Sequence, residues 1–220
     1  MTSEKIIVVT ARTGGRDALR DDQVTAGATF IAYVDEPVET AVWDQRPVCR
    51  TFNSHRRNSR IHKILIHQYV DAAYSLWMDA NVSLRVPAEQ LVDEWLGHHD
   101  IAMFKHRTRD CMYDEAEVCA KLELDDPKLI LEQRDTYHGR GFPRSLGLGE
   151  ASVILRRHTA GVRNFNNAWW AEYCRFSVRD QISVMVAARE TATSFNLITP
   201  TKFHHPYFQI SPRPAGVEPI

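Results

Sequence analysis

The sequence has no long apolar run, no excess of charge of one sign and no paired cysteine motif. No stretch approaches about 18 consecutive apolar residues, so no transmembrane helix is expected. The first apolar run, residues 6–9, is too short for the core of a signal peptide. Lysine and arginine total 27 against 28 acidic residues, giving a net charge of −1. This balance excludes a chain-wide positive field for nucleic acid or anionic membranes and leaves only local basic patches.

Cysteine is scarce, and none of the four cysteines has the CxxC spacing of a zinc knuckle or redox pair. Free thiols in a reducing compartment are therefore expected. The chain also lacks internal repeats, low-complexity tracts and an interdomain linker. With 220 residues, of which 44% are hydrophobic and 25% charged, it has the composition of one folded domain. We assign residues 1–198 to that domain and residues 199–220 to an extended, proline-rich tail.

Strand-like and helix-like segments alternate along the chain. Continuous β-branched and apolar runs predict buried strands, whereas apolar residues at a spacing of three or four predict helices. The expected strands are residues 6–9, 29–34, 48–52, 73–78, 101–104 and 152–155. The expected helices are residues 61–69, 87–96, 113–121, 128–137, 162–173 and 179–189. Such alternation predicts one α/β domain with a mostly parallel central sheet flanked by helices.

Polar residues follow three of the expected strands, where ligands of parallel sheets bind. They are Thr10 with Arg12, then Asp35, and then Asp79 with Asn81. In an extended chain the side chains of Asp79 and Asn81 point to one side and could hold a hard divalent cation. The alternative is an Asx turn that closes the strand.

A local basic cluster spans residues 55–67 in an otherwise neutral chain. Arg60 and Lys63 are three residues apart and share one helix face. A guanidinium fork and an ammonium group are the usual pair for gripping phosphate oxygens. A solvated helix face is the alternative, but this helix precedes the strand that ends at Asp79, so both could reach one pocket.

Further candidates lie in the second half of the chain. His106 and Arg107 follow an expected strand and precede a helix that carries Glu115. This position suits a ligand site, and a solvated charged loop is the alternative. Asp180 begins the last helix, where the helix dipole favours an acid. His204 or the adjacent His205 could supply a late metal ligand, because neutral imidazole binds divalent cations.

Five sequence blocks occur in an order that resembles a known family. They are Arg56–His67, Tyr74–Asn81, His106–Glu117, Glu150–His158, and Trp169-Trp170 followed by Arg179–Ser183. Together they resemble the glycosyltransferase-like domain family of plant Golgi proteins of mucilage and turgor biology, which was long a domain of unknown function. The resemblance covers roughly residues 5–190.

The resemblance implies a GT-A-like, nucleotide-sugar-binding fold and a glycosyltransferase. Asp79-Ala80-Asn81 occupies the place of the metal-binding D-x-D motif, with Asn81 replacing an acid. A divalent metal, Mn²⁺ or Mg²⁺, would then be held by Asp79 and Asn81 with His204. Asp180-Gln181 is similar to the catalytic pair of retaining GT-A enzymes.

The resemblance also suggests roles for the remaining candidates. A nucleoside-diphosphate sugar such as a UDP-sugar would be bound by Thr10, Arg12, Asp35, Arg60, Lys63 and Asp79. The sugar or acceptor would be contacted by His106, Arg107, Glu115, Glu150, Trp170 and Arg179.

Two other functions compete with the transferase hypothesis. A metal-dependent hydrolase of the amidase or ceramidase kind would use Asp79 and the histidines to activate water. A nucleic-acid binder would use the basic cluster, although the neutral net charge argues against it. The acceptor could be a polysaccharide, a glycan or a modified nucleobase. The lack of a membrane anchor suggests a bacterial or phage enzyme of the cytoplasm.

Overall fold

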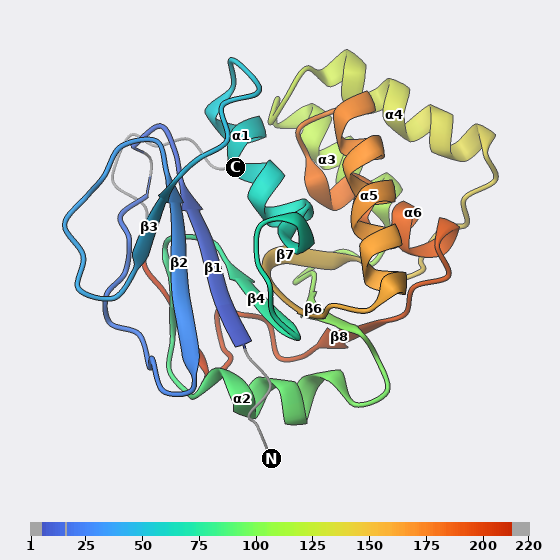
Figure 1. Ribbon diagram of the computed structural model, residues 1–220. Helices are drawn as coiled ribbons and strands as arrows, with labels where there is room; N and C mark the ends of the chain where they lie inside the picture. The colour runs from blue at the N-terminus through green and yellow to red at the C-terminus, as the bar shows by residue number, and fades with distance from the viewer. Residues whose placement is uncertain (1–5, 16, 213–220) are drawn as a thin grey trace.

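A seven-stranded sheet forms the centre of the computed structural model, which describes residues 6–15 and 17–212 (Figure 1). The strand order is β3-β2-β1-β4-β7-β6-β8, and β7 alone runs antiparallel to its neighbours in this sheet. The strands are β1 (Ile6–Arg12), β2 (Ala28–Val34), β3 (Asp44–Pro47), β4 (Tyr74–Met78), β6 (Ile101–Lys105), β7 (Gly149–Arg157) and β8 (Phe195–Ile198). The predicted α/β class and mostly parallel sheet are confirmed.

Helices cover both faces of the sheet. One face packs on α2 (Ala88–Leu91), which continues as a π-helical turn, Val92–Leu96, and on a small sheet of β5 (Val82–Leu84) and β9 (Phe208–Ile210). The other face packs on helices from both halves of the chain, and Figure 1 shows α2 lying apart from them. These are α1 (His55–Ile64), α5 (Ala160–Arg175) and α6 (Asp180–Glu190), with α3 (Met112–Lys121) and α4 (Pro127–Gly139) packed beyond α6.

The two cores explain why the strand sequences are continuously apolar. Ile6 and Val8 of β1 lie in the core under α2, whereas Ile7 and Val9 lie in the core under α1 and α5. A strand buried on both faces needs apolar residues at every position. Helix α1 starts immediately after β3 and its loop because Ser54 caps it, with Ser54 Oγ accepting a hydrogen bond from the Arg57 amide.

The structure differs from the sequence prediction at the sheet edge and in the short strands. The third strand lies at Asp44–Pro47, so the predicted strand at residues 48–52 is wrong. Its residues are mostly exposed, and such an edge strand carries little apolar pattern. Strands β5, β8 and β9 have only three or four residues each, which is too short for a periodic pattern to reveal them.

The segment from Thr199 to Pro212 packs against the domain instead of projecting from it. Strand β9 pairs with β5, and the Arg85 amide donates a hydrogen bond to the carbonyl of Tyr207. Residues 213–220 lie outside the described part of the chain. Among the described helices, none has both the length and the apolar character needed to cross a membrane.

Replacing Phe208 with alanine is expected to lower the free energy of unfolding by about 3 kcal/mol, because a buried aromatic ring is lost from the core under α2. Phe208 is 6% exposed and packs against Trp95 and Phe104. Urea denaturation measures the loss. The matched control is Phe203→Ala in the same segment, since Phe203 is 51% exposed and its removal should leave the unfolding free energy nearly unchanged. Equal losses for the two variants would contradict the role of Phe208 as the anchor of this segment.

Candidate functional site

Four adjoining cavities follow the edge of the sheet at which β1, β2 and β4 end. Their volumes are about 390, 290, 260 and 390 Å³. The first and second cavities share Thr13 and His55, and the second and third share Arg60 and Asp79. The third and fourth share Asp79 and Lys202. The cavities therefore form one continuous groove at the edge where ligands of α/β sheets bind.

Asp35 organises the first cavity. Its Oδ2 accepts a hydrogen bond of 2.5 Å from the amide of Gly14 and lies 3.2 Å from Nδ1 of His55. Gly14 has a φ of +68°, and a Cβ there would come within 3.2 Å of the His55 ring. A glycine is needed for this turn, which brings the loop after β1 against the start of α1. The predicted nucleotide-binding residue Asp35 thus lines the groove.

Arginines dominate the second cavity. Arg12 lines it and donates a hydrogen bond from Nε to the carbonyl of Asp17. Arg56 also lines it and donates from Nη1 to the carbonyl of Leu124. Burial, followed by repulsion from Arg60 and Arg179, lowers the pKa of Arg56 to about 10. Burial is the larger cause of this shift, and the charges of the two neighbouring arginines add to it.

Asp180 is the centre of the third cavity. Its Oδ2 lies 2.7 Å from Nζ of Lys63 and 3.0 Å from Nε of Arg60, and all three side chains are at least nine-tenths buried. Burial alone would raise the pKa of Asp180, but the charges of Lys63 and Arg60 outweigh it and hold the pKa well below its usual range. Asp180 is therefore more than a first-turn acid: it binds the two cations that α1 presents.

Asp79 lies where the second, third and fourth cavities meet. Its Oδ1 accepts a hydrogen bond of 3.1 Å from Nε1 of Trp77 and lies 3.9 Å from Nζ of Lys63. Asn81 lines the fourth cavity with Asp79 and donates from Nδ2 to the carbonyl of Ser211. Because Nδ2 is the donor there, the oxygen of Asn81 is the atom available to a cation.

Cationic side chains outnumber carboxylates in the second and third cavities together. Six lysines and arginines line these cavities against four aspartates and glutamates. Lys202 forms an ion pair with Glu150 there. Arg179 is 5% exposed, and its Nε has no hydrogen-bond partner within the described residues. A buried surplus of positive charge with a free donor is the environment that an anionic ligand requires.

Glu115 lies behind Arg179 rather than in the cavity. It is 2% exposed, accepts a hydrogen bond of 2.6 Å from Nε of Arg109 and lies 4.0 Å from Nη2 of Arg179. His106 accepts a hydrogen bond from the backbone amide of Arg109 and lies 3.7 Å from Glu115. Glu115 and His106 thus form a charged cluster behind Arg179 and line none of the four cavities, and their predicted contact with sugar or acceptor stays a prediction.

Other predicted residues lie at the groove or apart from it. Gln181 lines the third cavity, and Arg107 packs over the ring of Phe203 at the boundary of the third and fourth. Thr10 is buried within the sheet, and Trp170 packs against Phe52 and Tyr173. Neither of these two residues lines the four cavities described above.

The two late histidines are also separate from Asp79. Nδ1 of His204 lies 3.4 Å from Oγ1 of Thr201, and His205 packs among aromatic rings that include Trp95 and Phe104. Neither lines the fourth cavity with Asp79. The structure thus brings together Asp79 and Asn81 of the predicted metal ligands, without His204.

Sequence reasoning missed Arg56, Lys202 and Phe203 as residues of the groove. Arg56 belongs to the basic cluster, which was the one signal available, but spacing did not separate it from Arg57. Lys202 and Phe203 reach the groove because the segment after β8 folds back onto the strand ends. No local pattern in the sequence indicates that return.

The chain is similar to known glycosyltransferase-like proteins. A family model described as "TOD1/MUCI70, glycosyltransferase-like domain" matches residues 48–205. A protein of Arabidopsis thaliana named "Probable hexosyltransferase MUCI70" is 30% identical over an alignment of 156 residues that covers 66% of this chain. The aligned part spans 27% of that relative, about a quarter of its length.

Solved structures with a related overall arrangement are remote in sequence. Mouse xyloside xylosyltransferase 1 gives a TM-score of 0.47 at 9% identity, covering 89% of this chain and 84% of that one. The galactosyltransferase LgtC, solved with donor and acceptor sugar analogues, gives 0.45 at 10% identity and covers 92% and 90%. Likeness at this level does not assign a role to any residue.

Replacing Asp180 with asparagine is expected to lower the free energy of unfolding by about 3–5 kcal/mol at neutral pH, because Lys63 and Arg60 stay buried without their carboxylate. The pKa of Asp180 is lowered in the folded protein, so its contribution is present above the unfolded pKa of about 4 and is lost as the pH falls further. The difference between parent and variant, measured by urea denaturation, should therefore narrow below about pH 4.

Asp135→Asn provides the control for that measurement. Asp135 pairs with Arg134 on the surface of α4, where its side chain is 67% exposed, so the substitution should cost less than about 1 kcal/mol. A loss for Asp180→Asn no larger than this surface value would show that the buried ion pairs do not stabilise the fold.

Proposed function

The chain belongs to the TOD1/MUCI70 glycosyltransferase-like domain family, and on that premise we propose that it transfers a sugar from a nucleoside-diphosphate sugar to an acceptor hydroxyl. The observation that carries the proposal is the buried surplus of cations in the second and third cavities. A nucleoside diphosphate carries the opposite charge, and the four cavities are arranged along one groove that could hold it.

The donor is proposed to lie along the groove from the first cavity to the third. Asp35 and Arg12 would contact the nucleoside; both were predicted to bind the nucleotide-sugar from their positions after expected strands, although Arg12 is the last residue of β1. Arg60, Lys63 and Arg179 would face the diphosphate. Guanidinium groups suit this task because their fork of donors matches phosphate oxygens. The third cavity, lined by Asp180, Gln181 and Glu150, would then receive the sugar.

Transfer breaks the bond between the anomeric carbon and a diphosphate oxygen and forms a bond from that carbon to the acceptor oxygen. The proton of the acceptor hydroxyl passes to the departing diphosphate. Negative charge grows on the departing diphosphate, and buried cations that are already in position stabilise it without reorganisation. Asp180 stays ionised because of its lowered pKa, so we assign it to holding Lys63 and Arg60 in place and not to accepting the acceptor's proton. Gln181, uncharged and on the same cavity, is proposed to contact the sugar.

Asp79 and Asn81 suit a divalent cation, because a carboxylate and an amide oxygen line one cavity beside the cationic groove. They would hold Mn²⁺ or Mg²⁺, and His204 is not included in this set. When bound, the metal would supply further positive charge against the diphosphate. Lys63, 3.9 Å from Asp79, supplies part of that charge from the protein itself.

The two competing hypotheses receive no support from the site. Within residues 6–15 and 17–212, no three His, Cys, Asp or Glu side chains gather as a metal-binding group of the kind a hydrolase would use. Arg60 and Lys63 of the basic cluster line the third cavity and are buried against Asp180, so they do not form a solvated helix face of the kind that a nucleic-acid backbone would contact. The cytoplasmic location and the bacterial or phage origin stay predictions.

The decisive experiment is a screen of nucleoside-diphosphate sugars, with and without manganese, for thermal stabilisation and for release of nucleoside diphosphate. Binding of a ligand at 100 times its dissociation constant stabilises a protein by about 2.7 kcal/mol, which a melting curve detects. We expect one nucleotide series to stabilise the chain. Failure of every nucleotide to bind would refute the transferase proposal.

Arg56→Gln is expected to weaken binding of nucleoside diphosphate about tenfold while leaving the ligand-free protein as stable as the parent or more so. The physical reason is that Arg56 is repelled by Arg60 and Arg179 in the empty groove, and this repulsion disappears with its charge. Calorimetric titration and melting curves measure the two effects.

Arg57→Gln is the matched control on the same helix. Arg57 lines none of the four cavities: its guanidinium lies over the rings of Phe52 and Tyr173 and donates to the carbonyl of Phe176. This variant should bind nucleoside diphosphate like the parent protein. Equal weakening by both substitutions would mean that Arg56 acts through general charge and not at the groove.

Asp79→Asn is expected to abolish the effect of manganese on nucleotide binding, because it removes the formal negative charge from the metal pair. Asn81→Asp should strengthen the manganese effect, since it adds a second carboxylate. Titration of nucleoside diphosphate with and without manganese tests both variants. An unchanged manganese dependence in Asp79→Asn would refute the proposed metal ligands.

A further inference from the structure

Arg156 is a fully buried cation outside the candidate site. It lies in β7 with 0% of its surface exposed, and its guanidinium sits 5.8 Å from the centre of the Trp169 ring. Within the described residues, Nε and both Nη atoms have no hydrogen-bond partner, and no carboxylate pairs with them. A buried charge in this state costs several kcal/mol unless something compensates it. Burial lowers the pKa of Arg156 to about 9, so the group is still charged at neutral pH.

The neighbours of Arg156 are polar but not acidic. Arg156 stands opposite Ser75 of β4, and Oγ of Ser75 lies 2.8 Å from Nε2 of His158, two residues further along the chain. On the covering helix, Nδ2 of Asn166 lies 3.1 Å from Nδ1 of His67. The Oδ1 atom of Asn166 is also buried and lacks a partner in the described structure.

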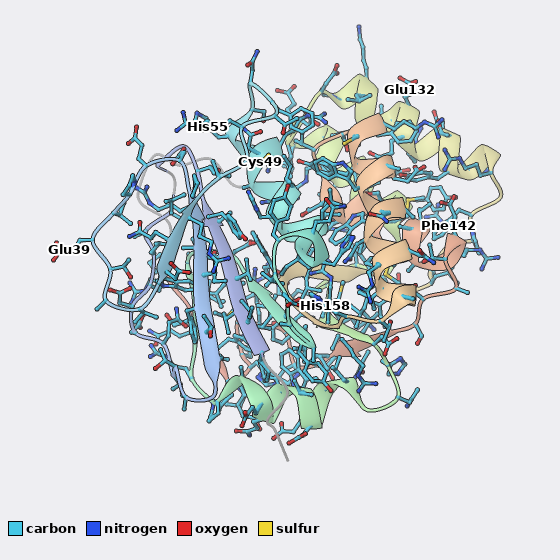
Figure 2. The ribbon with its side chains drawn as sticks, viewed as in Figure 1. Glu39, Cys49, His55, Glu132, Phe142 and His158 are labelled. Carbon is cyan, nitrogen blue, oxygen red and sulfur yellow. The ribbon has the colours of Figure 1, made fainter. Side chains whose placement is uncertain are left out.

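A cavity of about 610 Å³ opens beside this cluster. His67, His158 and Arg163 line it, and Asp71 is the one carboxylate among its described lining residues. The cavity lies at the end of the sheet where β4 begins, whereas the candidate site lies at the end where β4 stops. Figure 2 shows His158 well separated from His55, which belongs to the first cavity of the groove.

We propose that this cavity is a second, non-catalytic site that binds a compact oxyanion, with inorganic phosphate as its simplest representative. His67, His158 and Arg163 would contact the anion, and Arg156 would supply a buried positive charge behind them. An oxyanion here would offset the charge of Arg156 electrostatically, without touching it, and would accept hydrogen bonds from the side chains that line the cavity.

The positive charge of Arg156 already acts on the cavity wall. Burial and, after it, the charge of Arg156 lower the pKa values of both His67 and His158, the latter to about 4. The geometry agrees, because Ser75 stands opposite Arg156 in the sheet and contacts His158, which lines the cavity. An anion bound in the cavity would be attracted by the same positive charge.

The test is a titration of the full chain with potassium phosphate, followed by calorimetry and thermal melting. Saturating nucleoside diphosphate is present to occupy the catalytic groove, and potassium chloride of equal ionic strength serves as the blank. The parent protein should bind phosphate. Arg163→Ala and His158→Asn should each raise the dissociation constant about tenfold, the factor for one charge-assisted hydrogen bond. Arg175→Ala, at the far end of the same helix α5, should bind like the parent.

The Arg156→Met variant distinguishes an arginine that supports an anion site from one that only stabilises the fold. In phosphate-free buffer this variant should melt at the same temperature as the parent or higher, because an uncompensated buried charge is removed. It should also lose the stabilisation by phosphate. The proposal is overturned if the parent does not bind phosphate under these conditions, or if Arg163→Ala and His158→Asn bind it as tightly as the parent. It is equally overturned if Arg156→Met is less stable than the parent yet still stabilised by phosphate.

Discussion

The buried ion pairs of Asp180 with Lys63 and Arg60 are the contacts on which the rest of the site depends. They connect the first residue of α6 to the second half of α1, and Lys63 and Asp180 are 117 positions apart in the sequence. Without the carboxylate, two cations would remain buried at the end of β4, a state that the fold would relieve by opening the groove. Asp79 approaches Lys63 from the strand side, so α1, β4 and α6 meet at one ammonium group. The contacts at Lys63 therefore fix how α1, β4 and α6, which form the walls of the groove, are placed relative to one another.

The remaining cations of the groove are less well compensated, which would be the cost of binding the proposed diphosphate ligand. Arg56 is repelled by its neighbours, and Arg179 relies on Glu115 at 4.0 Å, with its Nε unpaired within the described structure. Full pairing of these groups would stabilise the empty protein but would leave no donors for a diphosphate. Preorganised donors that face a cavity are the arrangement by which proteins stabilise developing negative charge. Stability and proposed function are therefore opposed at these two arginines.

Much of the fold could be predicted from the sequence, because β1, β2 and β4 are buried on both faces and cannot tolerate polar residues. The edge strand β3 could not, since its exposed residues Asp44 and Arg46 carry no apolar signal. In the site, polar residues that end buried strands, such as Asp35 and Asp79, were predictable from topology alone. The pairing of Asp180 with Lys63 was not, because it depends on how α1 and α6 pack. Lys202 shows the same limit: its place at the groove is set by the pairing of β9 with β5, a contact between residues more than 120 positions apart.

The two edges of the sheet handle buried positive charge by different means. At the edge with the candidate site, Lys63 and Arg60 share the carboxylate of Asp180, and Lys202 has that of Glu150. The surplus of positive charge at that edge is modest and faces open cavities, so a ligand can contact the cationic side chains directly. At the other edge, no carboxylate within the described residues pairs with Arg156, and its guanidinium lies 5.8 Å from the centre of the Trp169 ring. Its charge can act only through its field on the histidines in front of it. A ligand at that edge would therefore be held mainly by the exposed lining residues, with affinity raised by a charge that it does not touch.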